Sequence, residues 1–232
     1  GNGEDLIQAL TLMATKKGHA RRIGQGAKAL AKEYGHPELF MGVKSIPLAP
    51  FDPRSLQGMG LHFVTSNYGP HHLYAYTFFD EVLNIHEQLD PWTTEGKPEF
   101  VKRVQDITAV MDSLGLCNWS LMGLKFNNFV PMINSCLGTS YKAEDLLQTG
   151  ERIWNLERQF NMRAGFNRSH DILPERFIDE PIIEGPAKGQ TSRADEMLND
   201  YYKLRGWDEE GRPGSEILRT LELGSRDAKN KD

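Results

Sequence analysis

Several features are scarce in this 232-residue sequence, and each scarcity excludes a class of protein. Only two cysteines are present, Cys117 and Cys136, which is too few for the disulfide framework of a small secreted domain. No apolar run approaches the ~18–20 residues that span a bilayer, and the N-terminus lacks a charged-then-apolar signal pattern. The sequence therefore predicts a cytoplasmic protein with no membrane contact.

A concentrated positive charge is also missing. The formal net charge is −5, the isoelectric point is near 5.8, and the basic residues are dispersed along the chain. This pattern argues against nucleic acid as a partner, because nucleic-acid binding requires a basic patch or stripe. With 39% hydrophobic and 25% charged residues, the chain has enough apolar material for one large or two small domains.

What the sequence does contain is helical periodicity, interrupted by segments rich in glycine and proline. Apolar spacings of three and four predict helices over 4–16, 20–34, 71–84, 98–114, 124–136, 142–163, 193–205 and 214–222. The first two should pack together. Long irregular loops are expected at 41–69 and 166–192, and a disordered tail at 226–232. The predicted fold class is mainly α and multihelical, with two helical subdomains, residues 1–42 and 43–232.

The segment from Asp112 to Cys117 places a carboxylate, a tight turn and a cysteine at the end of a periodic helix. Gly115 is the residue type that ends a helix in the left-handed conformation, so Asp112 lies in the last turn. There its charge faces the negative end of the helix dipole at a cost of ~0.3–1 kcal/mol, which favours a cation or N–H donors beside it. Cys117 can bind a metal as the thiolate. The alternatives are a surface carboxylate and a buried structural thiol.

Three other side chains are ambiguous by themselves. The adjacent pair His71 and His72 has no second pair four residues on, so it fits a surface or helix-start pair as well as a functional site. An imidazole titrates near neutral pH and can move a proton during catalysis. Cys136 has no motif around it, which favours a structural thiol.

The stretch from Asp112 to Cys117 matches the Asp-x-x-Gly-Leu-Cys motif of the tungsten-dependent aldehyde:ferredoxin oxidoreductase family. Further segments resemble the C-terminal portion of that family in the same order. These are Gly1–Asp5, Asp52–Arg54, Gly58–Leu61, Thr65–Asn67, His72–Leu73, Glu151–Arg158, Leu173–Phe177, Gly185–Gly189 and Tyr201–Trp207. The family's N-terminal pterin-binding base and its Cys-x-x-Cys-x-x-x-Cys segment have no counterpart here. The resemblance therefore implies a fragment or one piece of a split enzyme.

The resemblance also implies roles for the motif residues. Asp112 would accept hydrogen bonds from the N–H and NH2 groups of a pterin, a role that suits a carboxylate with two acceptor oxygens. Gly115 would allow close approach, and Leu116 would contact the pterin through its backbone. Cys117 would be the fourth ligand of a 4Fe-4S cluster, for which thiolate is the usual protein ligand.

A second part of the resemblance concerns the segment before the histidines. His72, followed by Leu73, corresponds to a catalytic histidine that assists proton transfer. Relatives commonly read Ser-Asn-Arg-Gly where this chain has Asn67 and Tyr68 between a serine and a glycine. Both residues are expected at the cofactor, with a phenol replacing the usual cation.

The implied protein is an anaerobic electron-transfer enzyme that carries a tungsten, or less commonly molybdenum, bis-pterin and a 4Fe-4S cluster. It would oxidise a small aldehyde to a carboxylic acid, with ferredoxin as the electron acceptor. Its other expected partners are the N-terminal remainder of the enzyme and further copies of itself in a homo-oligomer. Two alternatives stay open: a benzoyl-CoA reductase type subunit that reduces an aromatic ring, and a non-catalytic helical docking module.

Overall fold

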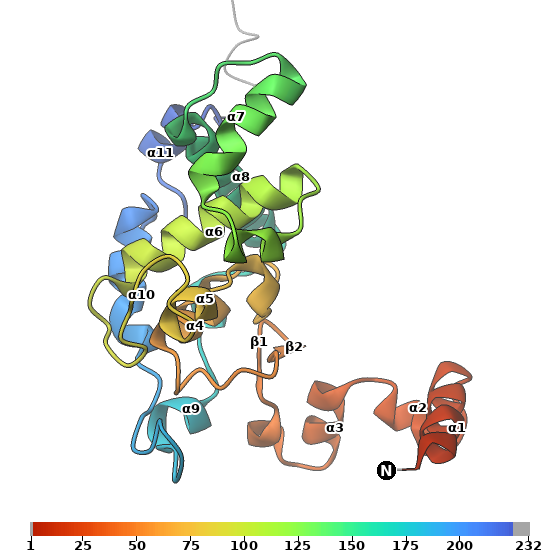
Figure 1. Ribbon diagram of the computed structural model, residues 1–232. Coiled ribbons are helices and arrows are strands. Elements are labelled where there is room, and N and C mark those ends of the chain that lie inside the picture. Colours follow the sequence, from red (N-terminus) through yellow and green to blue (C-terminus); the bar gives the residue numbers. More distant parts are fainter. Residues whose placement is uncertain (1, 225–232) are drawn as a thin grey trace, which may run out of the picture.

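The computed structural model describes residues 2–224, and its regular structure is almost entirely helical (Figure 1). This confirms the mainly α fold class, while the predicted tail at 226–232 lies outside the described residues. The helices are α1 (Gly3–Ala14), α2 (Ala20–Ile23), α3 (Ala27–Glu33), α4 (Gln57–Thr65), α5 (Phe78–Glu81), α6 (Lys97–Ser113), α7 (Phe126–Leu137), α8 (Ala143–Arg163), α9 (Glu175–Asp179), α10 (Ala194–Leu204) and α11 (Ser215–Thr220). The short elements are η1 (Pro37–Leu39), η2 (His72–Tyr74), η3 (Asn118–Met122), η4 (Arg168–His170), β1 (Gly42–Val43) and β2 (Ile46–Pro47).

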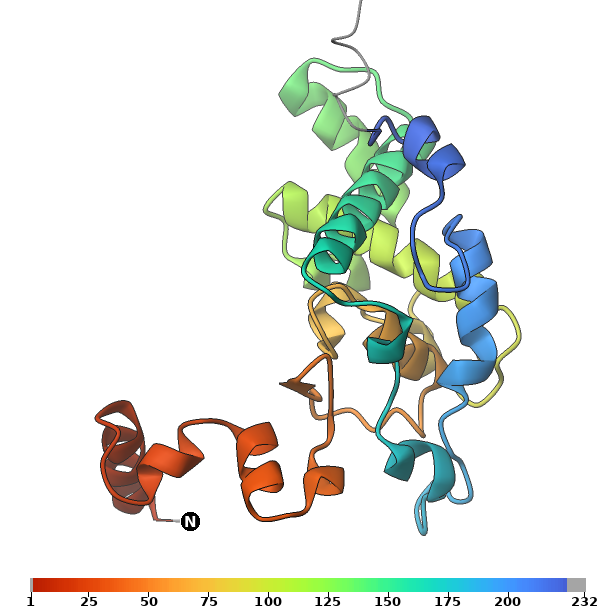
Figure 2. The ribbon, with the colours of Figure 1, turned by 180° about the vertical axis from the view of Figure 1, so that it is seen from behind.

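The two longest helices, α6 and α8, pack against each other and form the centre of the body (Figure 2). Their backbones approach closely at Gly150 of α8. A Cβ atom built there would lie 2.1 Å from the carbonyl oxygen of Asp106 on α6. The absence of a side chain at Gly150 therefore permits the contact that positions both helices beside the loops they support.

Helix α4 corrects the expectation of an unbroken irregular segment over 41–69. All nine of its residues are buried, so the helix has no polar face and its sequence shows no helical periodicity. Its two glycines permit close packing: a Cβ on Gly58 would lie 2.8 Å from the Glu81 carboxylate, and one on Gly60 would lie 2.8 Å from the Ser192 hydroxyl. The features that suggested a loop are those of a fully enclosed helix.

Two clusters of buried apolar side chains lie along α6. The first surrounds α4 and α10 and contains four large aromatic residues, Trp154, Tyr201, Tyr202 and Trp207. The second lies between α6, α7, α8 and the segment around α5, and includes Tyr76 and Phe79. The segment between α4 and α6 thus contributes to both clusters.

The N-terminal helices α1 to α3 form an arm that extends away from this body in both views (Figures 1 and 2). The predicted helix over 20–34 is wrong, because the chain breaks between α2 and α3, where Gly26 has φ +92°. The predicted apolar face of α1 exists, but Leu6, Ile7 and Leu10 are 53% to 67% exposed. Division of the chain into domains at residue 42 stays a prediction.

The segment 71–84, predicted as one helix, contains only η2 and α5. Between them the chain is extended at Ala75, whose φ is −163°. Here the apolar spacing reflects aromatic side chains turned into the second core from irregular backbone. Among residues 2–224, no helix has both the length and the apolarity needed to cross a bilayer.

Candidate functional site

The turn after α6 has the geometry that its sequence predicts. Gly115 has φ +67°, its N–H donates to the carbonyl of Asp112 at 3.0 Å, and the Leu116 N–H donates to the carbonyl of Met111 at 3.0 Å. These two bonds form a Schellman cap, which satisfies carbonyls that the end of a helix otherwise leaves unpaired. The cap brings Asp112, Leu116 and Cys117 onto one turn.

This turn forms one side of a cleft of about 830 Å³. The opposite side comes from the segment after α4 and from α8. Four residues predicted from the sequence line the cleft, namely Tyr68, Asp112, Leu116 and Cys117. The fold therefore brings together two segments that are more than forty positions apart in the sequence.

Asp112 is oriented by a residue that sequence reasoning missed. The Asn118 amide donates from Nδ2 to Asp112 Oδ1 at 2.8 Å, while its own Oδ1 is buried without a hydrogen-bond partner in the described residues. Partial burial raises the pKa of Asp112, and the hydrogen bond from Asn118 opposes that shift. The only sequence signal for Asn118 is its position directly after Cys117.

Asn67 connects the loop after α4 to α8. Its Nδ2 donates to the Trp154 carbonyl at 2.9 Å and to Glu157 Oε2 at 3.3 Å, and Asn161 donates to the Asn67 carbonyl at 2.6 Å. The side-chain oxygen of Asn67 is buried without a partner in the described residues. Asn67 therefore positions Tyr68 at the cleft, although it does not itself line it.

Glu157 is a second cleft residue that the sequence did not single out. It faces the cleft from α8, and its pKa is raised, first by burial and further by the negative charge of Asp112; the Asn67 amide opposes the shift. Two carboxyl groups with raised pKa values thus share the cleft. The match of residues 151–158 to the family was the available signal, but it did not show which side chain of α8 faces the cleft.

His71 and His72 lie side by side, with ring centroids 5.1 Å apart and planes 12° from parallel. His71 lines the cleft. His72 packs against Phe51 at 4.7 Å, its Nδ1 is buried without a partner in the described residues, and burial lowers its pKa. His72 is not among the residues that line the cleft, so its catalytic role stays a prediction, and its neighbour His71 is the histidine that faces the site.

A buried hydrogen-bond chain holds these histidines. Tyr201 and Arg205 donate to Gln105 Oε1 at 2.6 and 2.8 Å, which turns the Gln105 amide nitrogen toward His62 Nδ1 at 3.0 Å. His62 Nδ1 must then accept, so its Nε2 carries the proton and donates to the His71 carbonyl at 3.0 Å. Burial lowers the pKa of His62 to about 4, which keeps the ring neutral.

Both cysteines are free and exposed. Exposure of Cys117 suits a metal ligand, and the structural role expected for Cys136 on α7 stays a prediction. No cluster of three or more histidine, cysteine or acidic side chains able to hold a metal ion occurs within residues 2–224. Any cluster bound at Cys117 would therefore take its other ligands from outside this range.

The comparisons with known proteins agree with this geometry. The curated relatives that match are oxidoreductases, which gives the class of protein. A family model for aldehyde ferredoxin oxidoreductase, domains 2 and 3, matches residues 1–223. The chain belongs to the aldehyde ferredoxin oxidoreductase family.

Individual relatives show how much of the family's length is present. The chain is 42% identical to a tungsten-containing aldehyde ferredoxin oxidoreductase of Pyrococcus furiosus, over 95% of this chain and 37% of that protein. The corresponding enzyme of Thermococcus kodakarensis is 41% identical over 91% of this chain and 35% of its own length. The chain thus spans a little over a third of the length of these two relatives.

A solved structure shares the fold. The active-site complex BamBC of benzoyl coenzyme A reductase, with bound 1,5-dienoyl-CoA, superimposes with a TM-score of 0.71. The alignment covers 97% of this chain and 39% of the other at 20% identity. The helical arrangement is therefore shared with that chain.

Proposed function

We propose that this chain is the C-terminal part of a tungstopterin oxidoreductase that oxidises an aldehyde to a carboxylic acid. In the overall reaction, the aldehyde and water give the acid, two protons and two electrons. Ferredoxin accepts the electrons. Because the chain spans 37% of a 42%-identical relative, the N-terminal remainder of the enzyme would supply what residues 2–224 do not.

The observation that carries the proposal is the turn after α6. It brings a carboxylate and an exposed thiol to the same end of one helix, facing a cleft of about 830 Å³. Cofactor-binding pockets are of this size and are usually formed before the ligand arrives.

The polar groups of the cleft fit a pterin. Its ring edge presents N–H and NH2 donors, and the matching acceptors in the cleft are Asp112 and the unpartnered side-chain oxygen of Asn118. Gly115 has open space where a Cβ would lie, so a ring can approach the turn closely there. Tyr68 would contact the cofactor from the opposite wall. When bound, the metallopterin supplies the two-electron chemistry; tungsten is the expected metal and molybdenum the alternative.

Cys117 fits one corner of a 4Fe-4S cluster. Its thiol is exposed on the turn that also carries Asp112, so the cluster would lie close to the pterin. Such clusters are normally held by four cysteine thiolates. One thiolate from this chain would therefore be joined by three from the remainder of the enzyme.

His72 would accept a proton as the aldehyde is oxidised. Its lowered pKa keeps the imidazole neutral near pH 7, the form that can accept. His62 would support this role indirectly, because it fixes the backbone at His71.

Asp112→Asn tests the cofactor assignment in the holoenzyme. The substitution replaces a charge-assisted acceptor by a neutral amide and loses part of the ~1.5–3 kcal/mol typical of hydrogen bonds to charged groups. We expect a fall in pterin and tungsten per enzyme, measured by pterin fluorescence after oxidation and by elemental analysis. Asp200→Asn, an exposed change on α10, is the control. Equal cofactor content in both variants would contradict the assignment.

His72→Gln tests the catalytic role separately. Metal and pterin content should stay unchanged, while turnover of a small aldehyde falls by ~10²–10⁴-fold, the range for a lost proton-transfer group. His71→Gln is the matched variant, since its ring lies 5.1 Å away. If only His71→Gln loses activity, the assignment of His72 is wrong.

A further inference from the structure

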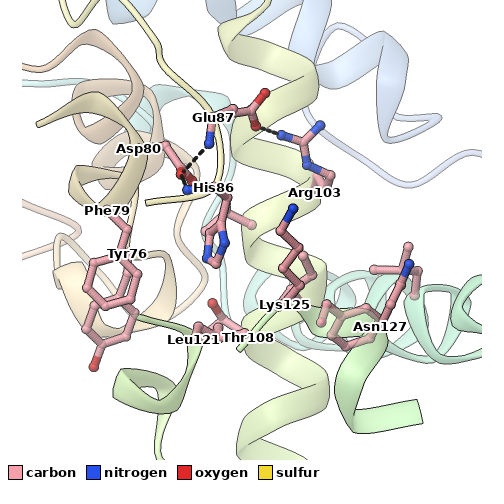
Figure 3. Close-up of a pocket in the computed structure, with 14 residues that line it drawn as sticks. Tyr76, Phe79, Asp80, His86, Glu87, Arg103, Thr108, Leu121, Lys125 and Asn127 are labelled. Atoms are coloured by element: carbon pink, nitrogen blue, oxygen red, sulfur yellow. Dashed lines mark hydrogen bonds and ion pairs between the residues drawn. The ribbon is translucent and has the colours of Figure 1, made fainter. Parts of the chain in front are cut away.

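A second hollow lies on the other side of Tyr76 from the cleft, between α6, the start of α7 and the segment around α5 (Figure 3). Its volume is about 390 Å³. Apolar side chains form most of its wall, among them the rings of Tyr76, Phe79 and Phe126. Ligand pockets have this composition and occupy roughly 300–1,000 Å³, so the size suits a small molecule.

One small polar side chain belongs to this wall. Thr108 on α6 is 2% exposed and lines the pocket. Its hydroxyl can donate and accept a hydrogen bond, so it adds a polar group to a mostly apolar surface.

Of the charged side chains at the mouth of the pocket, some have partners and one does not. Arg103 is paired with Glu87, and Asp80 accepts hydrogen bonds from the backbone N–H groups of His86 and Glu87 at 2.8 and 3.2 Å. Lys125 has no ion-pair partner among residues 2–224. Figure 3 shows its amino group near Arg103, across the pocket from the rings of Tyr76 and Phe79.

The backbone adds to this positive character. Lys125 precedes α7, and Phe126 and Asn127, its first two residues, also line the pocket. No acidic side chain occupies the first turn of α7. The positive end of a helix dipole and its unpaired N–H groups favour an anion. The group most favoured at the mouth is therefore negatively charged, while the interior favours an apolar body.

We propose that this pocket binds a small carboxylate with an apolar, ring-sized body. The body packs among Tyr76, Phe79 and Phe126, and the carboxylate lies between Lys125 and the N-terminus of α7. Aromatic rings in such a wall favour an aromatic body through offset and edge contacts.

Tyr76 connects this pocket to the proposed reaction. Its ring lines both hollows, and its pKa is raised by burial and then by the charges of Cys117 and Asp112 on the cleft side. An acid formed in the cleft would belong to the class of molecule that the pocket favours. This link rests on the proposed function, whereas the binding itself does not.

Calorimetric titration of the 232-residue chain with three probes tests the binding. Benzoate has both body and charge, benzamide has the body without the charge, and acetate has the charge without the body. We expect benzoate to bind at one site, benzamide to bind more weakly, and acetate not to bind. Shifts in the methyl resonances of Ile107 and Leu121 should place benzoate in this pocket.

Two variants distinguish charge from volume. Lys125→Met should lower the affinity for benzoate by about fivefold, the effect of losing one exposed charge contact. The affinity for benzamide should stay unchanged, because benzamide carries no charge. Lys142→Met is the control, because Lys142 precedes α8 as Lys125 precedes α7. Leu147→Phe, which fills the pocket, should abolish binding of both aromatic probes with the circular dichroism spectrum unchanged.

Equal affinity for benzoate and benzamide, or no benzoate binding at all, would overturn the proposal. Either result would leave the proposed function in place, since the titration requires no cofactor. Conversely, benzoate binding that depends on Lys125 would stand even if the holoenzyme oxidised no aldehyde.

Discussion

Burial of the His62 imidazole makes the stability of this protein depend on pH in a defined window. The pKa of His62 is lowered from its ordinary value of 6.5 to about 4 in the folded chain. Between these values the unfolded chain binds the extra proton and the folded chain does not. The free energy of unfolding should therefore fall as the pH falls from 6.5 to 4, by up to ~1.4 kcal/mol per pH unit.

Urea unfolding of the chain at pH 7.5, 6.5, 5.5 and 4.5 measures this dependence. His62→Gln should reduce the slope between pH 6.5 and 4.5, because an amide does not titrate there; the contribution of His72, whose pKa is also lowered by burial, should remain. His19→Gln, which changes an exposed histidine before α2, should leave the slope as it is in the native sequence. The account of the buried histidine fails if both variants keep the same slope.

Some residues of the candidate site can be predicted from the local sequence around them, and others cannot. Asp112, Gly115 and Cys117 carry their signal in six consecutive positions, because a helix cap is a local structure. Glu157 carries no such signal. It belongs to the site because α8 crosses α6, a long-range contact that no local pattern encodes.

At the scale of elements, the contact between α6 and α8 depends on one missing side chain. Gly150→Ala would place a Cβ atom 2.1 Å from the Asp106 carbonyl oxygen, so the two helices must move apart. Overpacking of this kind costs about 1–3 kcal/mol and outweighs the ~1 kcal/mol by which alanine favours a helix over glycine. We expect a net loss of stability in thermal unfolding of the chain.

Gly3→Ala is the matched change at the start of α1, where an added Cβ meets no atom within 4 Å. It should be neutral or slightly stabilising, because only the helix propensity changes. Similar melting temperatures for both variants would contradict the close helix contact at Gly150.

The same helices show how far periodicity predicts elements. Both α6 and α8 have one buried and one exposed face, and their predicted bounds differ from the observed bounds by at most one residue at either end. Helix α4 was missed because every one of its residues is buried. Periodicity detects the boundary between core and solvent, so an enclosed helix leaves no pattern to read.

At the scale of the whole molecule, the chain spans 37% of the Pyrococcus furiosus relative, and two of the surfaces open in residues 2–224 suit contact with the remainder. One is the cleft beside the turn after α6. The other is the apolar face of α1, where Leu6, Ile7 and Leu10 are exposed on the arm. We expect the remainder of the enzyme to bury apolar surface of this kind, because contiguous exposed apolar patches mark interaction sites.

The central claim is that the turn after α6 holds the cofactors of the enzyme, and the two cysteines allow its most direct test. Cys117 and Cys136 are both free and exposed, but only Cys117 lies on that turn. The measurement is iron and acid-labile sulfide per holoenzyme, purified without oxygen, for Cys117→Ser and Cys136→Ser. We predict loss of most of the iron and sulfide in Cys117→Ser and full content in Cys136→Ser. Full iron and sulfide in Cys117→Ser would contradict the account.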